Sequence, residues 1–325
     1  MRPHFSCLAR LRPAVAGAVL LLALPAAPGF AAGPATVTDA GGRTVTVADA
    51  GRIVSIGGAV TEILYALGRE ADVVAVDTSS LYPPRALKEK PNVGYMRRLS
   101  PEGILAMRPS VVLASKGSGP AEAVAVLESA EVPFVQVPDD ASAEGIVKKI
   151  RLIAAAIGEP ARGDCLAGVV GDDFSALAAE RKATGKPARV LFVLSFAGGR
   201  TMVAGRDTAA DGIIALAGAE NALADLTGYK PVGDEAIIAA KPDVILTMER
   251  PGAVITADDV FSRPAFGMTP AAANKRLIGM DGQYLLGFGP RTALAARDLA
   301  ARLYGTPASD ALAARHDAAV KACVK

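Results

Sequence analysis

Histidine, cysteine and tryptophan are scarce in this sequence. Its 325 residues include two histidines, three cysteines and no tryptophan. His4 and Cys7 lie at the extreme N-terminus, so the rest of the chain keeps only His316, Cys165 and Cys323. HExxH, GxSxG and CxxC motifs are all absent, and "GFGPRTA" (Gly287–Ala293) lacks the spacing of small residues that a dinucleotide loop requires. With no recognisable carboxylate pair for acid–base chemistry, the sequence favours neither an enzyme nor a zinc site.

Long apolar runs are also scarce. The one present, Ala14 to Leu24, follows a stretch with three arginines and precedes small residues. This pattern predicts a secretory signal over residues 1–31, cut near Ala31 and too short to span a membrane as a helix. Cys7 precedes the apolar run, which is the wrong place for a lipoprotein cysteine, so we expect a free soluble product.

Excess charge of either sign is absent from the expected mature chain. Residues 1–31 contain three arginines and no acidic residue, which leaves 32 basic residues against 33 acidic ones and a net charge of −1. A protein without a basic excess is a poor candidate for binding nucleic acid. We therefore expect no nucleic-acid partner.

Two segments of the chain repeat each other. "PEGILAMRPSVVLAS" (101–115) aligns without gaps with "DEAIIAAKPDVILTM" (234–248), pairing Glu102 with Glu235 and Arg108 with Lys241. Each copy predicts a short helix, a stop at a basic residue followed by proline, and a strand buried on both faces.

The remaining pattern predicts an α/β fold with two Rossmann-like lobes and mostly parallel sheets. Apolar positions spaced at helical intervals predict one long helix over residues 163–186 that joins the lobes. The expected organisation is a signal peptide over 1–31, an N-terminal α/β lobe over 32–162, the interdomain helix over 163–186 and a C-terminal α/β lobe over 187–325. Ligands of open α/β sheets bind beyond the carboxyl ends of the strands, so we expect a ligand cleft between the lobes. The predicted strands are 52–57, 72–77, 111–115, 134–138, 189–195, 244–248 and 276–281.

Each lobe offers a Gly-Tyr pair followed by a cation. "VGYMRR" places Tyr95 seven residues before Glu102, and "TGYKPV" places Tyr229 six residues before Glu235. The same feature at matching places in two lobes indicates two facing walls of one cleft. A surface turn remains the alternative for each tyrosine.

The runs "RIVSIGGAVTEILYALG", "PNVGYMRRLSPEGILAMRPSVVLAS" and "LLGFGPRT" resemble the haem (hemin) substrate-binding proteins of bacterial ABC importers, the HmuT/ShuT/PhuT type of class III periplasmic binding proteins. The resemblance covers nearly the whole mature chain, and the tyrosine in "VGYMR" is the haem-type hallmark. It implies a monomeric, non-enzymatic receptor in the periplasm that carries one haem b to an inner-membrane ABC permease and its ATPase. Receptors for cobalamin or ferric siderophores belong to the same superfamily and remain the alternative.

The resemblance also implies roles for individual residues. Tyr95 would be the axial ligand of haem iron, because a phenolate is a hard donor for a hard ferric ion. Arg97 would favour the anionic phenol, and Arg250 in "MERPG" is the best match for a second arginine near the haem or its propionates. Tyr229 would line the haem pocket.

Some relatives bind stacked haems through a histidine of the second lobe, but "LSFAGG" has Phe196 in that loop, so a single haem is expected. Glu102 and Glu235 would dock on the permease, although a glutamate in a first helical turn also simply suits the helix dipole. The sequence leaves open whether Cys165 and Cys323 form a disulfide. His316 is expected to be a solvated residue of a polar C-terminal helix.

Overall fold

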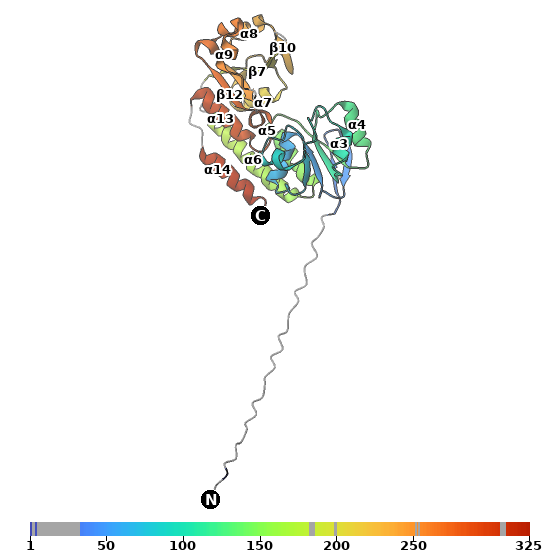
Figure 1. The fold of residues 1–325 in the computed structure, drawn as a ribbon. Coiled ribbons are helices and arrows are strands. Elements are labelled where there is room, and N and C mark those ends of the chain that lie inside the picture. The colour runs from blue at the N-terminus through green and yellow to red at the C-terminus, as the bar shows by residue number, and fades with distance from the viewer. Residues whose placement is uncertain are drawn as a thin grey trace. The chain divides into compact units, whose positions relative to one another are not determined.

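Two main β-sheets and a short hairpin organise the chain in this computed structural model (Figure 1). The structure describes residues 33–181, 186–197, 200–250, 252, 254–305 and 310–325, with Met1 and His4, so nearly all of the expected leader lies outside the described residues. Residues 33–325 form one compact unit. No helix within the described ranges has the length and apolar content needed to cross a bilayer.

The first sheet is wholly parallel and has the strand order β4-β3-β5-β6. All five residues of β5 are buried because helices cover both faces of the sheet, as the unbroken apolar run "VVLAS" predicts. The elements of this lobe are β1 (Ala35–Thr38), β2 (Thr44–Val47), β3 (Ile53–Ile56), α1 (Gly58–Ala66), β4 (Val73–Val76), α2 (Arg85–Glu89), α3 (Pro101–Leu105), β5 (Val111–Ser115), α4 (Ala121–Ser129), β6 (Phe134–Val137) and α5 (Ala143–Ala156).

The second sheet is mixed. Its order is β10-β8-β7-β11-β12, with β9 beside β7; β7, β11 and β12 run parallel, whereas β8 and β10 are antiparallel to their neighbours. β8 begins three residues after β7 ends, too short a connection for a crossover helix, so the pair must be antiparallel. The elements of this lobe are β7 (Arg189–Ala197), β8 (Arg200–Ala204), α7 (Ala209–Leu216), β9 (Glu220–Asn221), β10 (Tyr229–Val232), α8 (Asp234–Ala240), β11 (Val244–Glu249), α9 (Ala257–Phe261), α10 (Pro264–Gly267), α11 (Pro270–Ala273), β12 (Leu277–Asp281), α12 (Gly282–Leu286) and α13 (Thr292–Tyr304).

The repeat predicted from the sequence is present in the fold. α3 leads to β5 in the first lobe, and α8 leads to β11 in the second. The paired residues Arg108 and Lys241 both adopt left-handed backbone conformations, with φ of 48° and 44°, immediately before their prolines. Lys241 is the C-cap of α8, whereas Arg108 lies two residues after Ala106, the C-cap of α3; in both copies the chain turns here toward the strand.

A 22-residue helix, α6 (Pro160–Arg181), follows the first lobe and begins three residues before the predicted start. Residues 182–185 of the predicted helix lie outside the described part of the chain. The final helix, α14 (Asp310–Ala322), packs along α6 (Figure 1). A disulfide joins Cys165 to Cys323.

The expectation for His316 is wrong. Its side chain is only 3% exposed, and its Nδ1 lies 2.6 Å from the equally buried Oδ2 of Asp173 on α6. The polar neighbours of His316 in α14 suggested a solvated position, but His316 lies on the side of the helix that packs against α6. His316 therefore helps to hold the last helix in place.

Polar contacts link the two lobes along the segment 283–292. Gln283 donates from Nε2 to the carbonyl oxygen of Gly58 at 3.1 Å. Arg291 makes two side-chain contacts of 3.0 Å with the carboxylate of Glu62 on α1. This segment contains "GFGPRTA", which in the structure joins α12 to α13 and contacts the opposite lobe.

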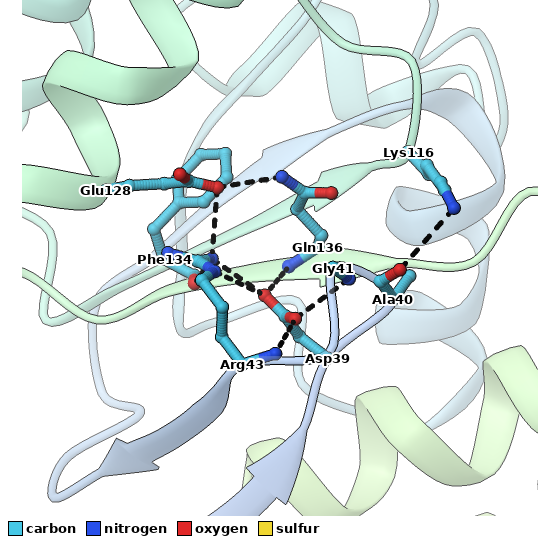
Figure 2. Close-up of polar contacts among 8 residues, drawn as sticks. All are labelled: Asp39, Ala40, Gly41, Arg43, Lys116, Glu128, Phe134 and Gln136. Atoms are coloured by element: carbon cyan, nitrogen blue, oxygen red, sulfur yellow. Dashed lines mark hydrogen bonds and ion pairs between the residues drawn. The ribbon is translucent and has the colours of Figure 1, made fainter.

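The hairpin β1–β2 is fastened to the edge strand β6 (Figure 2). Asp39, in its turn, accepts hydrogen bonds from the backbone N–H of Arg43 at 2.9 Å and of Gln136 at 3.3 Å, and it pairs with the Arg43 guanidinium at 2.7 Å. Burial by itself raises the pKa of Asp39, but these hydrogen bonds and the Arg43 charge outweigh it, so the pKa lies below its ordinary value. The turn thus covers backbone groups that the edge of the sheet would leave open.

Candidate functional site

Tyr95 lies in a tight loop between α2 and α3, just ahead of the helix start that the sequence predicts. Gly94 has φ of 94°, a conformation that glycine adopts without strain, and its N–H donates to the side chain of Asn92 at 2.8 Å. The Tyr95 carbonyl accepts a hydrogen bond of 2.7 Å from the N–H of Arg98. The backbone is therefore folded into a defined turn, whereas the Tyr95 side chain is 46% exposed and available to a ligand.

Arg97 of the first lobe acts electrostatically on Tyr229 of the second. Burial is the main cause that raises the pKa of the Tyr229 phenol, while hydrogen bonds involving Ala210 and Thr208 and the positive charge of Arg97 work in the opposite direction. The Tyr229 residue is 39% exposed, and its ring meets the edge of Phe192 with the centroids 6.4 Å apart. The charge of Arg97 thus favours the anionic form of Tyr229, although burial outweighs it.

Asp139 and Lys149 join this region, and the sequence reasoning missed both. Asp139 follows β6, and its Oδ1 lies 3.6 Å from Nζ of Lys149 on α5. Lys149 is fully buried and also donates to the carbonyl oxygen of Phe288 at 3.2 Å, across the lobes. Burial lowers the pKa of Lys149, and the negative charge of Asp139 opposes that shift. The sequence did contain a signal for Lys149, because this lysine lies on the apolar face of α5 beside Ile146 and Ile150, where a charged residue is unusual.

Arg250 stands at the exposed end of β11. Its Nη2 lies 3.7 Å from the sulfur of Met248, so the side chain folds back over its own strand. This places Arg250 at the carboxyl end of the second sheet, where the sequence predicts a ligand-facing residue. Its role toward a ligand stays a prediction.

Glu102 and Glu235 occupy equivalent positions in the two lobes. Each is exposed and lies in the first turn of its helix, α3 or α8. Ser100 caps α3 by accepting the N–H of Gly103 at 3.2 Å, and its hydroxyl donates to Glu102 at 3.1 Å. The two carboxylates are thus presented to solvent from matched elements, which fits docking and the helix-dipole interpretation equally well.

A separate cavity of about 360 Å³ lies between the lobes. Its wall includes Tyr82 from the first lobe and Tyr284 and Arg291 from the second, with the Arg291 guanidinium 3.3 Å from the centre of the Tyr82 ring. Burial, followed by the hydrogen bond to Asp298, raises the pKa of Tyr284, so this phenol stays protonated. The lining includes neither Tyr95 nor Tyr229, so this cavity is distinct from the predicted ligand residues.

Within the described ranges, no three His, Cys, Asp or Glu side chains are grouped as the ligands of a metal ion would be. What the candidate site does present is phenol oxygens and guanidinium groups. These groups suit a ligand that brings its own metal-binding ring and anionic substituents.

Comparison with known proteins agrees with this architecture. Residues 53–284 match the family described as periplasmic binding protein. An uncharacterised ABC transporter substrate-binding lipoprotein of Bacillus subtilis, YvrC, is 30% identical over 83% of this chain and 86% of its own. The vitamin B12-binding protein of Pectobacterium carotovorum is 24% identical over 78% of this chain and 88% of its own.

Solved structures extend the comparison. The periplasmic heme-binding protein RhuT from Roseiflexus sp. RS-1 has 41% identity and a TM-score of 0.75, and the match covers 78% of this chain and 98% of that one. BhuT, solved with two hemes, has 38% identity and a TM-score of 0.75 over the same shares. A periplasmic heme-binding protein from Pseudomonas aeruginosa has 32% identity and a TM-score of 0.72 over 79% of this chain and 93% of that one. The predicted two-lobed α/β fold and the predicted resemblance are confirmed.

Proposed function

Because this chain belongs to the periplasmic binding protein family, we propose that it captures one ferric haem between its lobes and delivers it to an inner-membrane ABC permease and its ATPase. Members of this family bind solutes for transport and are not enzymes, and membership implies a location outside the cytoplasm. The proposal adds the identity of the solute, the ligand residue and the delivery step.

One observation carries the proposal: Tyr95 is 46% exposed in a turn held by backbone hydrogen bonds, and Arg97 follows it two residues later. A phenolate oxygen is a hard donor that suits ferric iron, and the arginine supplies positive charge next to it. The high identity to heme-binding proteins of known structure supports the same ligand.

Tyr95 suits the ligand role better than Tyr229 does. Burial raises the pKa of Tyr229, which disfavours the phenolate that iron requires, and the Tyr229 ring rests against Phe192. In this arrangement Tyr95 binds the iron and Tyr229 lines the pocket. Arg97 and Arg250 are then available to pair with the propionates, and the absence of a histidine near Phe196 favours one haem over a stacked pair.

Cobalamin is the second candidate, because several vitamin B12-binding proteins are 24–26% identical to the chain over about three quarters of its length. A corrinoid carries its cobalt fully ligated and needs no phenolate. The exposed tyrosine beside an arginine therefore favours haem.

A titration in the visible spectrum tests the proposal. Hemin added to the purified mature protein should give a Soret band that saturates at one equivalent, together with the charge-transfer band of a phenolate bound to ferric iron. Cyanocobalamin tested in parallel should not bind to the protein. A protein that is silent toward hemin and binds the corrinoid would overturn the assignment in favour of the second candidate.

A further inference from the structure

Asp77 is a fully buried carboxylate for which the function proposed so far has no use. It follows β4 at the carboxyl end of the first sheet and has no exposed surface. No cation pairs with it among the ion pairs of the described residues. A buried carboxylate without a counter-ion is costly unless several donors satisfy it, so such a group calls for an explanation.

Four donors converge on this carboxylate. The N–H of Gly57 donates to Oδ1 at 2.9 Å and the N–H of Ser79 to Oδ2 at 3.0 Å. The hydroxyls of Ser79 and Ser80 both donate to Oδ1 at 3.0 Å. Asp77 therefore shapes the turn 77–80 and ties it to the start of α1.

The turn 77–80 is in contact with the loop that carries Tyr95. The N–H of Thr78 donates to the carbonyl oxygen of Gly94 at 2.8 Å, and Oγ of Ser79 lies 3.9 Å from the sulfur of Met96. Gly94 and Met96 are the residues on either side of Tyr95. On the far side of the loop, the N–H of Gly119 donates to the carbonyl oxygen of Met96 at 2.9 Å.

The loop is thus held at both neighbours of Tyr95, while the tyrosine side chain itself stays exposed. Val93 and Met96 are partly buried against the core of this lobe, which anchors the same segment by packing. A ligand group held in place before binding spares the ligand the cost of ordering it. Of these hydrogen bonds, the one from Thr78 to Gly94 belongs to the turn that Asp77 organises.

We propose that Asp77 is a positioning residue that orients the Tyr95 loop for its ligand. The expected effect of Asp77 on ligand binding rests on the proposed function, whereas the contacts between Asp77, its turn and the Tyr95 loop do not. It assigns to Asp77 an effect on both the mobility of residues 94–98 and the strength of the iron–phenolate bond.

The decisive variant is Asp77→Asn, which keeps the shape and loses one oxygen acceptor. The matched control is Ser55→Ala, because the Ser55 hydroxyl lies 2.7 Å from Thr61 and reaches the turn 77–80 only through Thr61 and Ser80. The Ser55 carbonyl oxygen, which accepts the N–H of Asp77 at 3.2 Å, is kept in this variant. Hydrogen–deuterium exchange on the ligand-free protein should be about tenfold faster at the amides of Thr78 and Arg98 in Asp77→Asn, corresponding to one weakened hydrogen bond. Ser55→Ala should leave both amides unchanged. Equal exchange in Asp77→Asn and the unaltered protein would overturn the proposal whether or not the protein binds haem.

A double-mutant cycle then connects the loop to the ligand. Asp77→Asn should release hemin about tenfold faster and shift the phenolate charge-transfer band, yet it should have no further effect when Tyr95 is already phenylalanine. An equal effect of Asp77→Asn in both backgrounds would show that it acts through general stability, and would refute the positioning role. If Asp77→Asn fails to fold, Ser79→Ala removes one donor of the same turn and takes its place in both measurements. If the unaltered protein gives no Soret band, the proposed function fails while the exchange comparison still decides the role of Asp77.

Discussion

Tyr95 and Tyr229 are held in different ways, although both follow a glycine. The backbone around Tyr95 is fixed by neighbouring loops and its ring is exposed, whereas the Tyr229 ring packs on Phe192 and burial raises the pKa of its phenol. A metal ligand must be both reachable and able to lose its proton. Because burial raises the pKa of the Tyr229 phenol, Tyr95 stays the proposed iron ligand.

Replacing Tyr95 by phenylalanine removes the phenol oxygen and keeps the ring. We expect the phenolate charge-transfer band of the hemin complex to disappear and hemin affinity to fall by about tenfold or more, since a change of about 1.4 kcal/mol is tenfold in affinity. Visible spectra and hemin titration measure both effects. Tyr82→Phe, in the separate cavity, is the control and should behave as the unaltered protein; an unchanged spectrum in Tyr95→Phe would refute the ligand assignment.

Asp39 gives a residue-scale prediction about acid stability. Its folded-state pKa lies below the unfolded value of about 3.9, so its stabilisation is complete above that value and is lost as the pH falls through the folded pKa. Asp39→Asn should cost about 1–3 kcal/mol of unfolding free energy at pH 7, because several donors lose their acceptor.

Urea unfolding at a series of pH values checks this prediction. The difference between Asp39→Asn and the unaltered protein should shrink below about pH 4, once the carboxylate of the unaltered protein becomes protonated. Asp49→Asn, an exposed aspartate of the same region, should show no such pH dependence. A constant difference between pH 7 and pH 3 would contradict the role given to the Asp39 charge.

The sequence indicated candidate site residues but not their partners. Tyr95, Arg97 and Tyr229 were singled out because a Gly-Tyr pair recurs in both lobes, and their roles stay predictions. Lys149 and Asp77 were missed because their role depends on burial and on donors from other segments. His316 was misjudged for the same reason, since its partner Asp173 is 143 residues away.

At the scale of elements, α3–β5 and α8–β11 show that one local design occurs twice. The basic residue before each proline adopts the same left-handed conformation, and the first turn of each helix presents one glutamate. We propose that these two carboxylates, at equivalent positions of the two lobes, dock on the permease. This is the geometry on which the docking proposal rests.

Charge reversal tests that proposal. The double variant Glu102→Lys, Glu235→Lys should bind hemin with an affinity within about twofold of that of the unaltered protein. Its transport of hemin through the reconstituted permease should be about tenfold slower, because the reversed charges repel the partner. The loss of a favourable helix-dipole interaction should cost only about 0.3–1 kcal/mol of stability at each site. Glu122→Lys, in the first turn of α4, is the control. Normal uptake by the doubly reversed variant would reject docking and leave the dipole interpretation.

The central strands and their flanking helices could be predicted because burial on two faces produces unbroken apolar runs. The hairpin β1–β2 and the antiparallel strands β8 and β10 could not, because their short, mixed sequences carry no such signal. Pro231 even lies within β10, where a strand interior would disfavour it; β10 is an edge strand and can accommodate it.

At the scale of the whole molecule, the chain links its lobes in three ways. First, α6 leads out of the first lobe, and near the end of α6 the carboxylate of Glu180 pairs with the guanidinium of Arg297 on α13, with Nη2 and Oε1 2.7 Å apart. The segment 283–292 reaches Gly58 and Glu62 of the first lobe. α14 then returns along α6 until Val324 packs against Gly68, at the end of α1. The two lobes are thus joined by contacts along α6, along the segment 283–292 and at the C-terminus.

The disulfide is the covalent part of this connection. We expect Cys165→Ser with Cys323→Ser to lower the unfolding free energy by about 2–5 kcal/mol, because the bond restricts a long loop of the unfolded chain. Hemin affinity should change little, since the bond joins α6 to the residue after α14 and not to the loop of Tyr95. Thiol labelling of the native protein should detect no reactive cysteine until a reductant is added; two free thiols without reductant would contradict the bond.

The placement of that bond has a topological result. Residues 166–322, which include every strand and helix of the second lobe, form a covalent ring closed by Cys165 and Cys323. A single protease cut anywhere in this ring opens the polypeptide without releasing a fragment, so the nicked molecule keeps its full mass until the sulfur bridge is reduced.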